Sequence, residues 1–193
     1  MARNKEFDEE TALRAAMQVF WAKGYSATSI HDLEEATGLL RTSIYNTFGN
    51  KRELFKSCLA LYGRRIERAL AEIVAGASTS REVVRHWHAR VIGMLTDPQT
   101  PAGCLVVFSV LEGEQHDAET KAMAAALMSE VHRQFEGILQ KGVRRGELSA
   151  ELDCAGVAGA LSSITWGLAV LAAAGSPPEQ LRSIAQETLR LLG

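Results

Sequence analysis

Three glycines divide the first fifty residues of this chain into short amphipathic segments. Gly24 follows a segment with apolar residues at helical spacing, and Gly38 and Gly49 each end a segment of about two turns. Glycine ends helices in the left-handed conformation, so this spacing predicts one helix of ordinary length and then two very short ones. Two short helices joined by a tight turn that contains glycine are typical of the helix-turn-helix motif.

The apolar and capping residues agree with these three helices. One apolar stripe at positions i, i+3, i+4 and i+7 runs along the first segment and consists of Leu13, Ala16, Met17 and Phe20. Asp8 precedes this stripe as an N-cap, so we expect the first helix to extend from Asp8 to Lys23. The second helix begins at Thr28 and Ser29, whose hydroxyls either cap it or bind phosphate. The third begins near Leu40.

The third helix has one apolar side and one polar side. A spacing of four places Leu40, Ile44 and Phe48 on the side that we expect to face the core. The other side carries Arg41, Thr42, Ser43, Tyr45, Asn46 and Thr47. All six can form hydrogen bonds and none is acidic, whereas a merely solvated face usually includes aspartate and glutamate. Base edges and phosphates bind such side chains, so the pattern favours DNA binding over a solvated face.

The start of the fourth helix is a second candidate site for DNA phosphates. Asn50 and Glu53 form a capping-box-like start for this helix, which the apolar spacing extends to about Val74. Its first backbone N–H groups and the ammonium of Lys51 together suit an anion, because helix N-termini bind anions. The net charge of the whole chain is −2, but residues 39–56 contain four basic residues against one acidic residue.

These motifs together resemble the N-terminal domain of the TetR/AcrR family of bacterial regulators. The resemblance covers residues 20–55 and rests on the spacing of Gly24, Thr28, Ser29, Gly38, Tyr45, Phe48 and Lys51. It implies a cytoplasmic, dimeric repressor whose helical C-terminal domain binds an effector. It also implies phosphate contacts by Tyr45 and Lys51, with the groove-facing residues being Arg41, Thr42, Ser43 and Asn46. A dimer also suits recognition, since two heads roughly 34–36 Å apart read a palindrome in successive major grooves.

One position departs from the family pattern. The family usually has a small polar residue where this chain has Leu40, and that residue caps the third helix. Leucine has no side-chain acceptor, so the helix start must use water or another side chain, and loss of a cap costs about 1 kcal/mol. The missing cap affects the expected backbone position of Arg41 and leaves the expected fold unchanged.

The remainder of the chain predicts an all-α protein. Strong helix formers are abundant, prolines number four, and 47% of the residues are hydrophobic against 23% charged. The apolar spacing predicts helices over residues 81–95, 104–112, 118–145, 153–174 and 178–192. Residues 76–80 and 97–103 are predicted loops. We therefore expect a helix-turn-helix domain over residues 1–56 and a larger helical effector-binding and dimerisation domain over residues 57–193.

Residues 154–174 form a run of 21 residues without a charged side chain. Such a run is long enough to span a membrane, but it is rich in small residues and has no lysine or arginine close to either end. We therefore favour a helix that protein buries on most sides. Small residues permit close helix packing, and the resemblance implies that the last two helices form a four-helix bundle with a partner subunit.

The expected effector site lies among apolar residues of the C-terminal domain. The turn at Gly103, Cys104 and Leu105, with Glu112 following, resembles a family pattern that begins a helix of the ligand cavity. Candidate pocket residues are Trp87, Val91, Cys104, Phe108, Leu111, Met123, Leu127, Met128, Phe135 and Trp166. Most of them are expected to be core, and a minority to touch a ligand. Their aromatic and methionine content suits an apolar effector.

Cys104 permits a second interpretation of the trigger. It follows a glycine at a predicted helix N-terminus, where a thiol pKa can be lowered, so its oxidation or alkylation would release DNA. The competing interpretation, which we favour, is a small buried hydrophobic residue. The three cysteines are far apart, and the first six residues lack the apolar stretch of a signal peptide. Both observations predict a reducing cytoplasm.

Other classes of function find little support in the sequence. No nucleophile–base arrangement, phosphate loop or cysteine–histidine cluster is present, which argues against an enzyme, a cofactor or a metal site. His86 and His88 are two residues apart and point to different sides of one helix. The sequence does not separate a repressor from an activator, or a small-molecule effector from a protein effector.

Overall fold

The computed structural model describes residues 8–193, so the polar start at residues 1–6 lies outside the described residues. Within this part of the chain the structure is helical without strands, as the sequence predicts. Its helices are α1 (Glu9–Ala27), α2 (Ile30–Thr37), α3 (Arg41–Phe48), α4 (Lys51–Gly76), α5 (Ser80–Leu95), α6 (Leu105–Leu111), α7 (Ala118–Arg144), α8 (Cys154–Ala173) and α9 (Pro178–Thr188). Short 3-10 turns at Gly113–Gln115 and Leu189–Leu192 follow α6 and α9.

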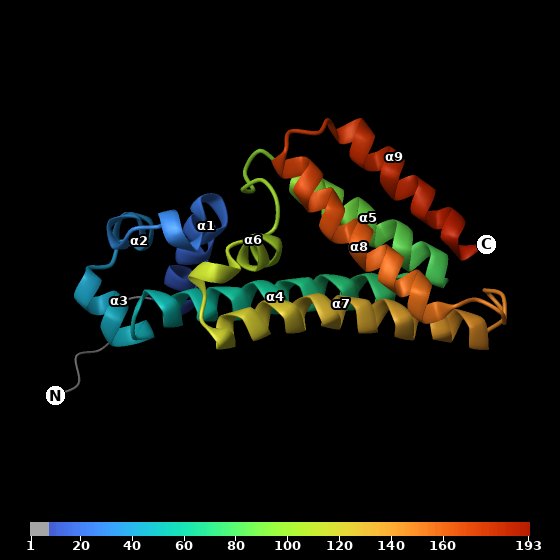
Figure 1. Ribbon diagram of the computed structural model, residues 1–193, viewed down its shortest axis with the longest axis horizontal. Helices are drawn as coiled ribbons and strands as arrows, with labels where there is room; N and C mark the ends of the chain where they lie inside the picture. The colour runs from blue at the N-terminus through green and yellow to red at the C-terminus, as the bar shows by residue number, and fades with distance from the viewer. Residues whose placement is uncertain (1–7) are drawn as a thin grey trace.

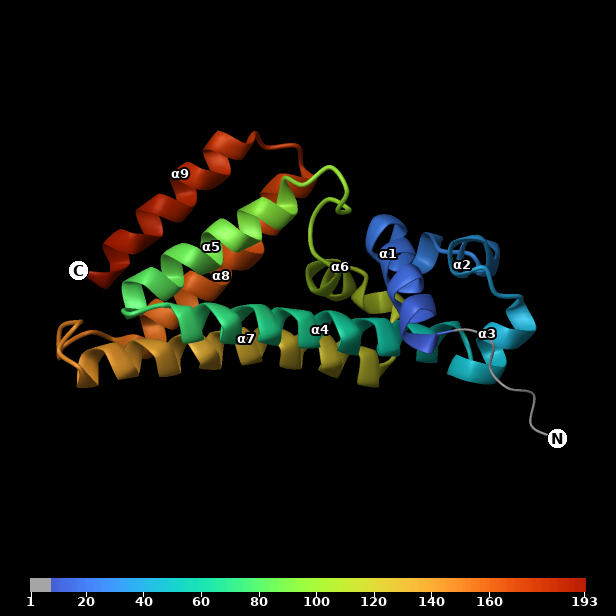
Figure 2. The ribbon, with the colours of Figure 1, turned by 180° about the vertical axis from the view of Figure 1, so that it is seen from behind.

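Two long helices set the length of the molecule. In Figures 1 and 2, α4 and α7 lie side by side along its long axis, with α1, α2 and α3 at one end and α5, α8 and α9 at the other. α6 lies between these groups and contacts α1. At Gly63 the two long helices approach so closely that a Cβ atom would collide with the Leu127 side chain. The predicted domain boundary between residues 56 and 57 falls inside α4, so one helix belongs to both parts.

Several helix starts have side-chain caps, and those of Asp8, Ser29 and Asn50 are the ones that the sequence predicts. Six side chains accept a hydrogen bond from a backbone N–H in the first turn of the helix that follows, and they are those of Asp8, Ser29, Asn50, Thr79, Asp117 and Asp153. Gly38 ends α2 in the left-handed conformation, with φ 69°. Gly24 also has a positive φ of 78°, but it interrupts α1 without ending it, because residues 25–27 add a further turn.

The cores of the two ends are continuous. Aromatic rings of α1 and α4 pack edge to face, Phe20 on Phe55 and Trp21 on Tyr62, and the ring centroids of each pair are 5.0 Å apart. These four side chains are buried and belong to one apolar cluster that extends into α5, α6, α7 and α8. A movement of α1 therefore disturbs the core that it shares with the C-terminal helices.

A polar cluster lies buried between α5, α8 and α9. His88 is 1% exposed, with Nδ1 3.2 Å from the Thr188 hydroxyl and Nε2 3.5 Å from the Thr165 hydroxyl. The indole N–H of Trp87 donates to the same Thr165 oxygen at 3.1 Å. Burial lowers the pKa of His88 from 6.5 to about 4, because the charged imidazolium would lose its hydration.

We expect His88 to make the free energy of unfolding depend on pH between about 6.5 and 4. In this window the unfolded state binds the proton and the folded state does not, so stability is lost as the pH falls. The full effect is on the order of 3 kcal/mol. Urea denaturation of His88→Gln at several pH values should show a much shallower dependence.

The matched control is His86→Gln, which replaces an exposed histidine of the same helix and should keep the parent dependence. Some dependence should remain in both variants, because burial also lowers the pKa of His116. A His88→Gln variant with the parent dependence would contradict the assignment.

Candidate nucleic-acid interface and ligand cavity

The polar side of α3 lies at the surface. Its exposed or half-buried residues are Arg41, Thr42, Ser43, Tyr45, Asn46 and Thr47. Ile44, on the other side, is fully buried, and Phe48 packs against the core. The Arg41 guanidinium lies over the Tyr45 ring, 5.2 Å from its centroid. This side of α3 therefore presents cationic, hydroxyl and amide groups and no carboxylate, the groups that bind phosphates and base edges.

Leu40 does not face the core, contrary to the sequence prediction. Its side chain is 72% exposed at the N-cap of α3. Helical spacing does not apply to residue 40, because this residue precedes α3 and has extended backbone, with φ −67° and ψ 150°. Glu34 of α2 replaces the missing cap, since its carboxylate accepts the N–H of Arg41 at 2.6 Å. Of the two possibilities that the sequence leaves open, water or another side chain, the structure shows a side chain at this helix start.

Thr28 and Ser29 have different surroundings. Ser29 is exposed and caps α2 in a capping box with Asp32, whose carboxylate accepts the Ser29 N–H at 2.7 Å. Thr28 is 1% exposed, and its hydroxyl donates to the carbonyl of Gly24 at 2.6 Å. Of the two hydroxyls only that of Ser29 is exposed, and it donates to the Asp32 carboxylate at 2.8 Å, so a phosphate would compete with Asp32 for this donor.

The start of α4 is partly committed to its own cap. The Asn50 side chain accepts the N–H groups of Arg52 (2.9 Å) and Glu53 (3.1 Å), so two backbone donors that the sequence suggested for phosphate are occupied. The Lys51 ammonium lies 4.6 Å from the ring centroid of Tyr25. Burial lowers the Lys51 pKa. Lys51 is thus held against an aromatic face immediately after α3.

The excess of basic side chains at this end is smaller at the surface than in the sequence. Lys56 is buried and forms ion pairs with Glu53 (3.2 Å), Asp117 (3.4 Å) and Glu119. Arg52 also lies 3.7 Å from the Asp117 carboxylate. Arg41 and Lys51 therefore remain as the cations best placed beside the polar side of α3.

Glu112 joins the helix-turn-helix end to the rest of the molecule. Its carboxylate, at the end of α6, accepts the N–H groups of Tyr25 (2.9 Å) and Ser26 (3.2 Å). Both follow Gly24, where a Cβ atom would lie only 2.7 Å from the same carboxylate. The ring of His116 packs beside that of Tyr25, with centroids 4.9 Å apart. The absence of a side chain at residue 24 therefore allows the Glu112 carboxylate to reach the N–H groups of Tyr25 and Ser26.

A cavity of about 180 Å³ lies where the two ends of the molecule meet. Predicted pocket residues that line it are Trp87, Val91, Cys104 and Trp166. Lining residues that the sequence reasoning missed are Trp21, Tyr62, Arg65, Ile66, Ala69, Arg90, Met94, Leu95, Thr165 and Ala169. The lining residues of α4 could have been found from the sequence, because positions 62, 65, 66 and 69 share one helix face. Nothing in the sequence pointed to Trp21 as a lining residue, since it falls in the predicted helix-turn-helix domain.

The other six predicted pocket residues lie outside this cavity, and they are Phe108, Leu111, Met123, Leu127, Met128 and Phe135. Leu111 is 72% exposed on α6. Phe135 is fully buried, with its ring edge-on to Trp87. Apolar spacing identifies the buried side of a helix, but it does not show which helices enclose an open space.

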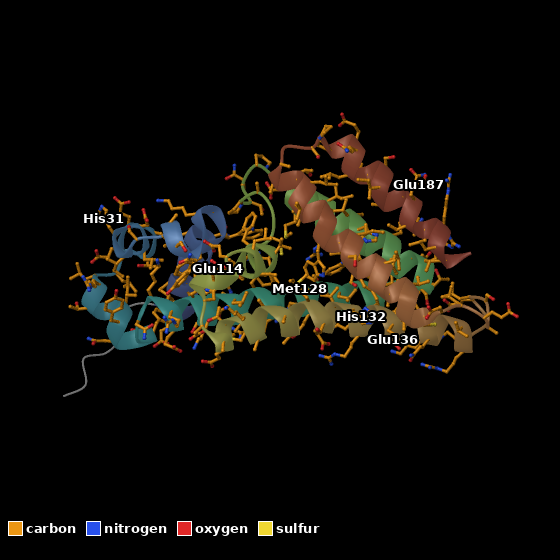
Figure 3. All side chains as sticks on the ribbon, viewed as in Figure 1. His31, Glu114, Met128, His132, Glu136 and Glu187 are labelled. Carbon is orange, nitrogen blue, oxygen red and sulfur yellow. The ribbon has the colours of Figure 1, made fainter. Side chains whose placement is uncertain are left out.

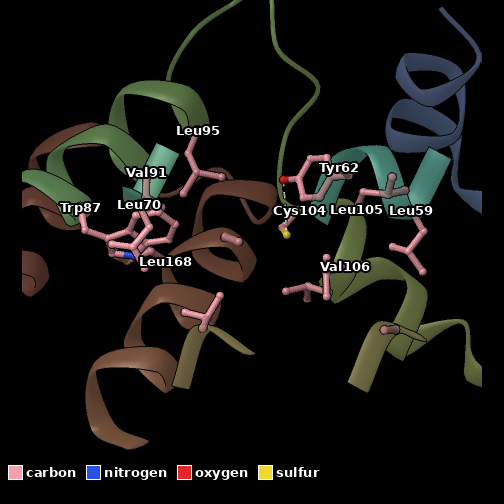
Figure 4. Packing of buried hydrophobic residues seen from close by; sticks show 14 of the residues in the cluster. Leu59, Tyr62, Leu70, Trp87, Val91, Leu95, Cys104, Leu105, Val106 and Leu168 are labelled. Carbon is pink, nitrogen blue, oxygen red and sulfur yellow. Dashed lines mark hydrogen bonds between the residues drawn. The ribbon is translucent and has the colours of Figure 1, made fainter. Parts of the chain in front are cut away.

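Cys104 is a buried thiol that borders the cavity. Cys104 is 4% exposed, and the Tyr62 hydroxyl lies 3.5 Å from its sulfur. Figure 4 shows this contact as a dashed line. Burial raises the pKa of the Cys104 thiol, whereas a reactive thiol requires a lowered pKa. The preceding carbonyl, that of Gly103, accepts the indole N–H of Trp21 at 3.2 Å. This position agrees with the interpretation of a small buried side chain.

No group of three or more metal-binding side chains is found in residues 8–193. His31 on α2 and His132 on α7 lie far apart (Figure 3). Each contacts a glutamate of its own helix, Glu35 at 3.4 Å and Glu136 at 4.0 Å.

The helix-turn-helix unit is joined by one long helix to a second helical part, which contains the cavity. This arrangement defines the class of protein as an α-helical DNA-binding regulator. The family model of bacterial regulatory proteins of the tetR family matches residues 12–58. The model of the tetracyclin repressor-like C-terminal domain matches residues 80–187. The chain therefore belongs to the TetR family of transcriptional regulators, which confirms the resemblance seen in the sequence.

Similar proteins match along nearly the whole chain. The HTH-type transcriptional repressor ComR of Escherichia coli (strain K12) is 32% identical over 192 residues, which are 98% of this chain and 90% of ComR. The uncharacterized HTH-type transcriptional regulator YezE of Bacillus subtilis (strain 168) is 32% identical over 78% of each chain. A cysteine mutant of the TetR family transcriptional regulator CifR, solved with 26-base-pair double-strand operator DNA, has a TM-score of 0.87 at 32% identity and covers 99% of this chain and 100% of that one.

Glu34 is expected to stabilise the start of α3. Glu34→Ala removes the acceptor of the Arg41 N–H and should lower the free energy of unfolding by about 1 kcal/mol, as loss of a cap does. Glu34→Gln keeps a side-chain oxygen and should cost less. The control Glu35→Ala removes only an exposed contact with His31 and should change stability by at most about 0.5 kcal/mol. Equal losses for the two alanine variants in urea denaturation would argue against this role.

Proposed function

We propose that this regulator is a homodimeric, cytoplasmic repressor that binds a palindromic operator and is released by a small effector. The observation that carries the proposal is the exposed polar side of α3, which has no carboxylate. The second helix of such a motif enters the major groove, where its N-terminal residues reach base edges. The proposed groove residues are Arg41, Thr42, Ser43, Asn46 and Thr47. The proposed phosphate contacts are Ser29, Tyr45 and Lys51.

Two comparisons support repression at an operator. ComR is named a transcriptional repressor, and the CifR structure contains double-strand operator DNA. The family and these relatives are regulators, so we propose no catalytic activity. Activation of transcription is the alternative outcome of a reporter assay.

The position of the cavity supports release by an effector. Trp21 belongs to α1 and also lines the cavity, so a ligand there contacts the helix-turn-helix end directly. A ligand shifts a population toward the state that it binds more tightly. If that state tilts α1 and the start of α4, the two heads of a dimer no longer match successive major grooves, and DNA is released.

A non-covalent effector is better supported than oxidation or alkylation of Cys104. The thiol is buried, burial raises its pKa, and the Tyr62 hydroxyl lies beside it. A thiol sensor needs an accessible sulfur with thiolate character. The reactive-thiol interpretation stays a prediction without support from this geometry.

The uncharged helix α8 supports a dimer. Among residues 8–193, α8 is the one helix that is long and apolar enough to cross a membrane. Only 33% of its most apolar stretch is buried within the subunit. Val170 on α8 is 47% exposed, and Leu191 after α9 is 41% exposed. A second copy of the chain packed on α8 and α9 would cover these apolar side chains, and a twofold contact of this kind joins identical surfaces.

Substitutions at the proposed phosphate contacts and at the proposed base contacts should affect DNA binding differently. Lys51→Ala should weaken binding to every sequence and reduce the salt dependence by about one counterion, and Tyr45→Ala should weaken binding uniformly. Arg41→Ala should instead relax base preference, with a loss of about 1–3 kcal/mol on the preferred site. Fluorescence anisotropy with the DNA that flanks the protein's own gene, at several salt concentrations, measures both effects.

The matched control for these variants is Lys141→Ala, at the far end of α7 from α3, which should bind as the parent does. Parent affinity at every salt concentration for the Tyr45 and Lys51 variants would refute the proposed interface.

Val170→Asp should convert the proposed dimer into monomers, because it places a carboxylate in an apolar contact between subunits. Operator affinity should fall by on the order of a hundredfold, since two linked heads bind far more tightly than one. Val74→Asp, at an exposed valine of α4, is the control and should stay dimeric. Sedimentation velocity measures the oligomeric state, and a dimeric Val170→Asp protein would rule out this surface.

A further inference from the structure

The cavity has an uneven distribution of charge. Its lining includes two guanidinium groups, those of Arg65 on α4 and Arg90 on α5, and no aspartate or glutamate. Both arginines are exposed residues, so they stand where the cavity meets solvent. We infer that the ligand of this cavity is a small aromatic carboxylate, with its ring between the tryptophans and its carboxylate at the two arginines. The inference rests on the proposed function, because it names the chemical class of the proposed effector.

Most polar groups inside the cavity are already hydrogen-bonded within the protein. Inside the cavity the Tyr62 hydroxyl lies beside the Cys104 sulfur, and the Trp87 N–H donates to Thr165. The Trp21 N–H donates to a backbone carbonyl. These donors already have partners, whereas the Trp166 N–H forms no hydrogen bond within residues 8–193. Apart from this one donor, the interior offers a ligand mainly apolar surface. A polar group on the ligand gains most at the mouth.

The mouth of the cavity is positively charged. Arg90 lies 3.7 Å from Glu72, and both side chains are more than half exposed, so this ion pair is weak. Arg65 has no carboxylate within ion-pair distance among residues 8–193. Guanidinium groups bind carboxylates through two parallel hydrogen bonds, and a cation here would be repelled by both arginines. The mouth therefore favours a monoanion.

The size and shape of the cavity limit the ligand further. The cavity measures about 180 Å³. An engineered apolar cavity of about 150 Å³ holds benzene, whereas pockets for drug-sized ligands measure roughly 300–1,000 Å³. Trp21, Trp87 and Trp166 supply aromatic walls, which pack well against a ring. One ring with a short acidic side chain fits this space, and long-chain acids or nucleotides do not.

The test compares three probes of similar size, phenylacetate, phenylacetamide and 2-phenylethylamine, by calorimetry with the full-length protein. Phenylacetate should bind about tenfold more tightly than phenylacetamide, and the amine should not bind measurably. The double variant Arg65→Gln, Arg90→Gln should lose the preference for phenylacetate and keep its affinity for phenylacetamide within about twofold. Arg68→Gln, one turn further along α4 and outside the cavity lining, is the control and should keep the preference.

Equal binding of phenylacetate and phenylacetamide, or a preference that survives in the double variant, would overturn the inference. So would the absence of binding by all three probes. Anisotropy with operator DNA separates this outcome from failure of the proposed function. Phenylacetate that binds without releasing DNA supports the ligand class and contradicts the effector role. Release by phenylacetamide alone contradicts the ligand class and supports the effector role.

Discussion

The packing of Trp21 joins the DNA-binding end of the molecule to its cavity. The indole is 2% exposed, stacks edge to face on Tyr62 of α4 and donates its N–H to the carbonyl of Gly103. It therefore touches the long helix and the turn before α6 while its own backbone belongs to α1. Because close-packed interiors transmit displacement rather than absorb it, a displacement of this ring would also move α1.

Glu112 adds a polar contact to this apolar one. Its carboxylate accepts two backbone N–H groups just after Gly24, so the end of α6 also holds the last turn of α1. Hydrogen bonds between a carboxylate and backbone N–H groups are strong and directional, and they fix orientation where apolar packing alone would permit sliding. Besides the continuous helix α4, the Trp21 and Glu112 contacts thus attach the helix-turn-helix unit to the C-terminal helices, and both involve α6 or the turn before it.

The fold followed from the sequence because its signals are local. Caps such as Asp8, Ser29 and Asn50, the left-handed Gly38 and the spacing of apolar residues act within one or two turns, so each helix can be placed from the sequence. The helix ends agree with the predicted ranges to within a few residues. The polar side of α3 was predicted by the same rule, whereas Leu40 was placed wrongly because the rule does not extend beyond the end of a helix.

The sequence by itself determined the helices, the family and the polar side of the recognition helix, since each depends on residues close together in the chain. Only the tertiary structure decided which side chains meet across the chain. Glu34 completes the start of α3 across a turn, and Lys56 pairs with Glu119, 63 positions later in the chain. Trp21 of α1 reaches a cavity lined mainly by α4, α5 and α8. Such contacts depend on how whole helices pack, and helix packing leaves only a diffuse pattern of apolar residues in the sequence.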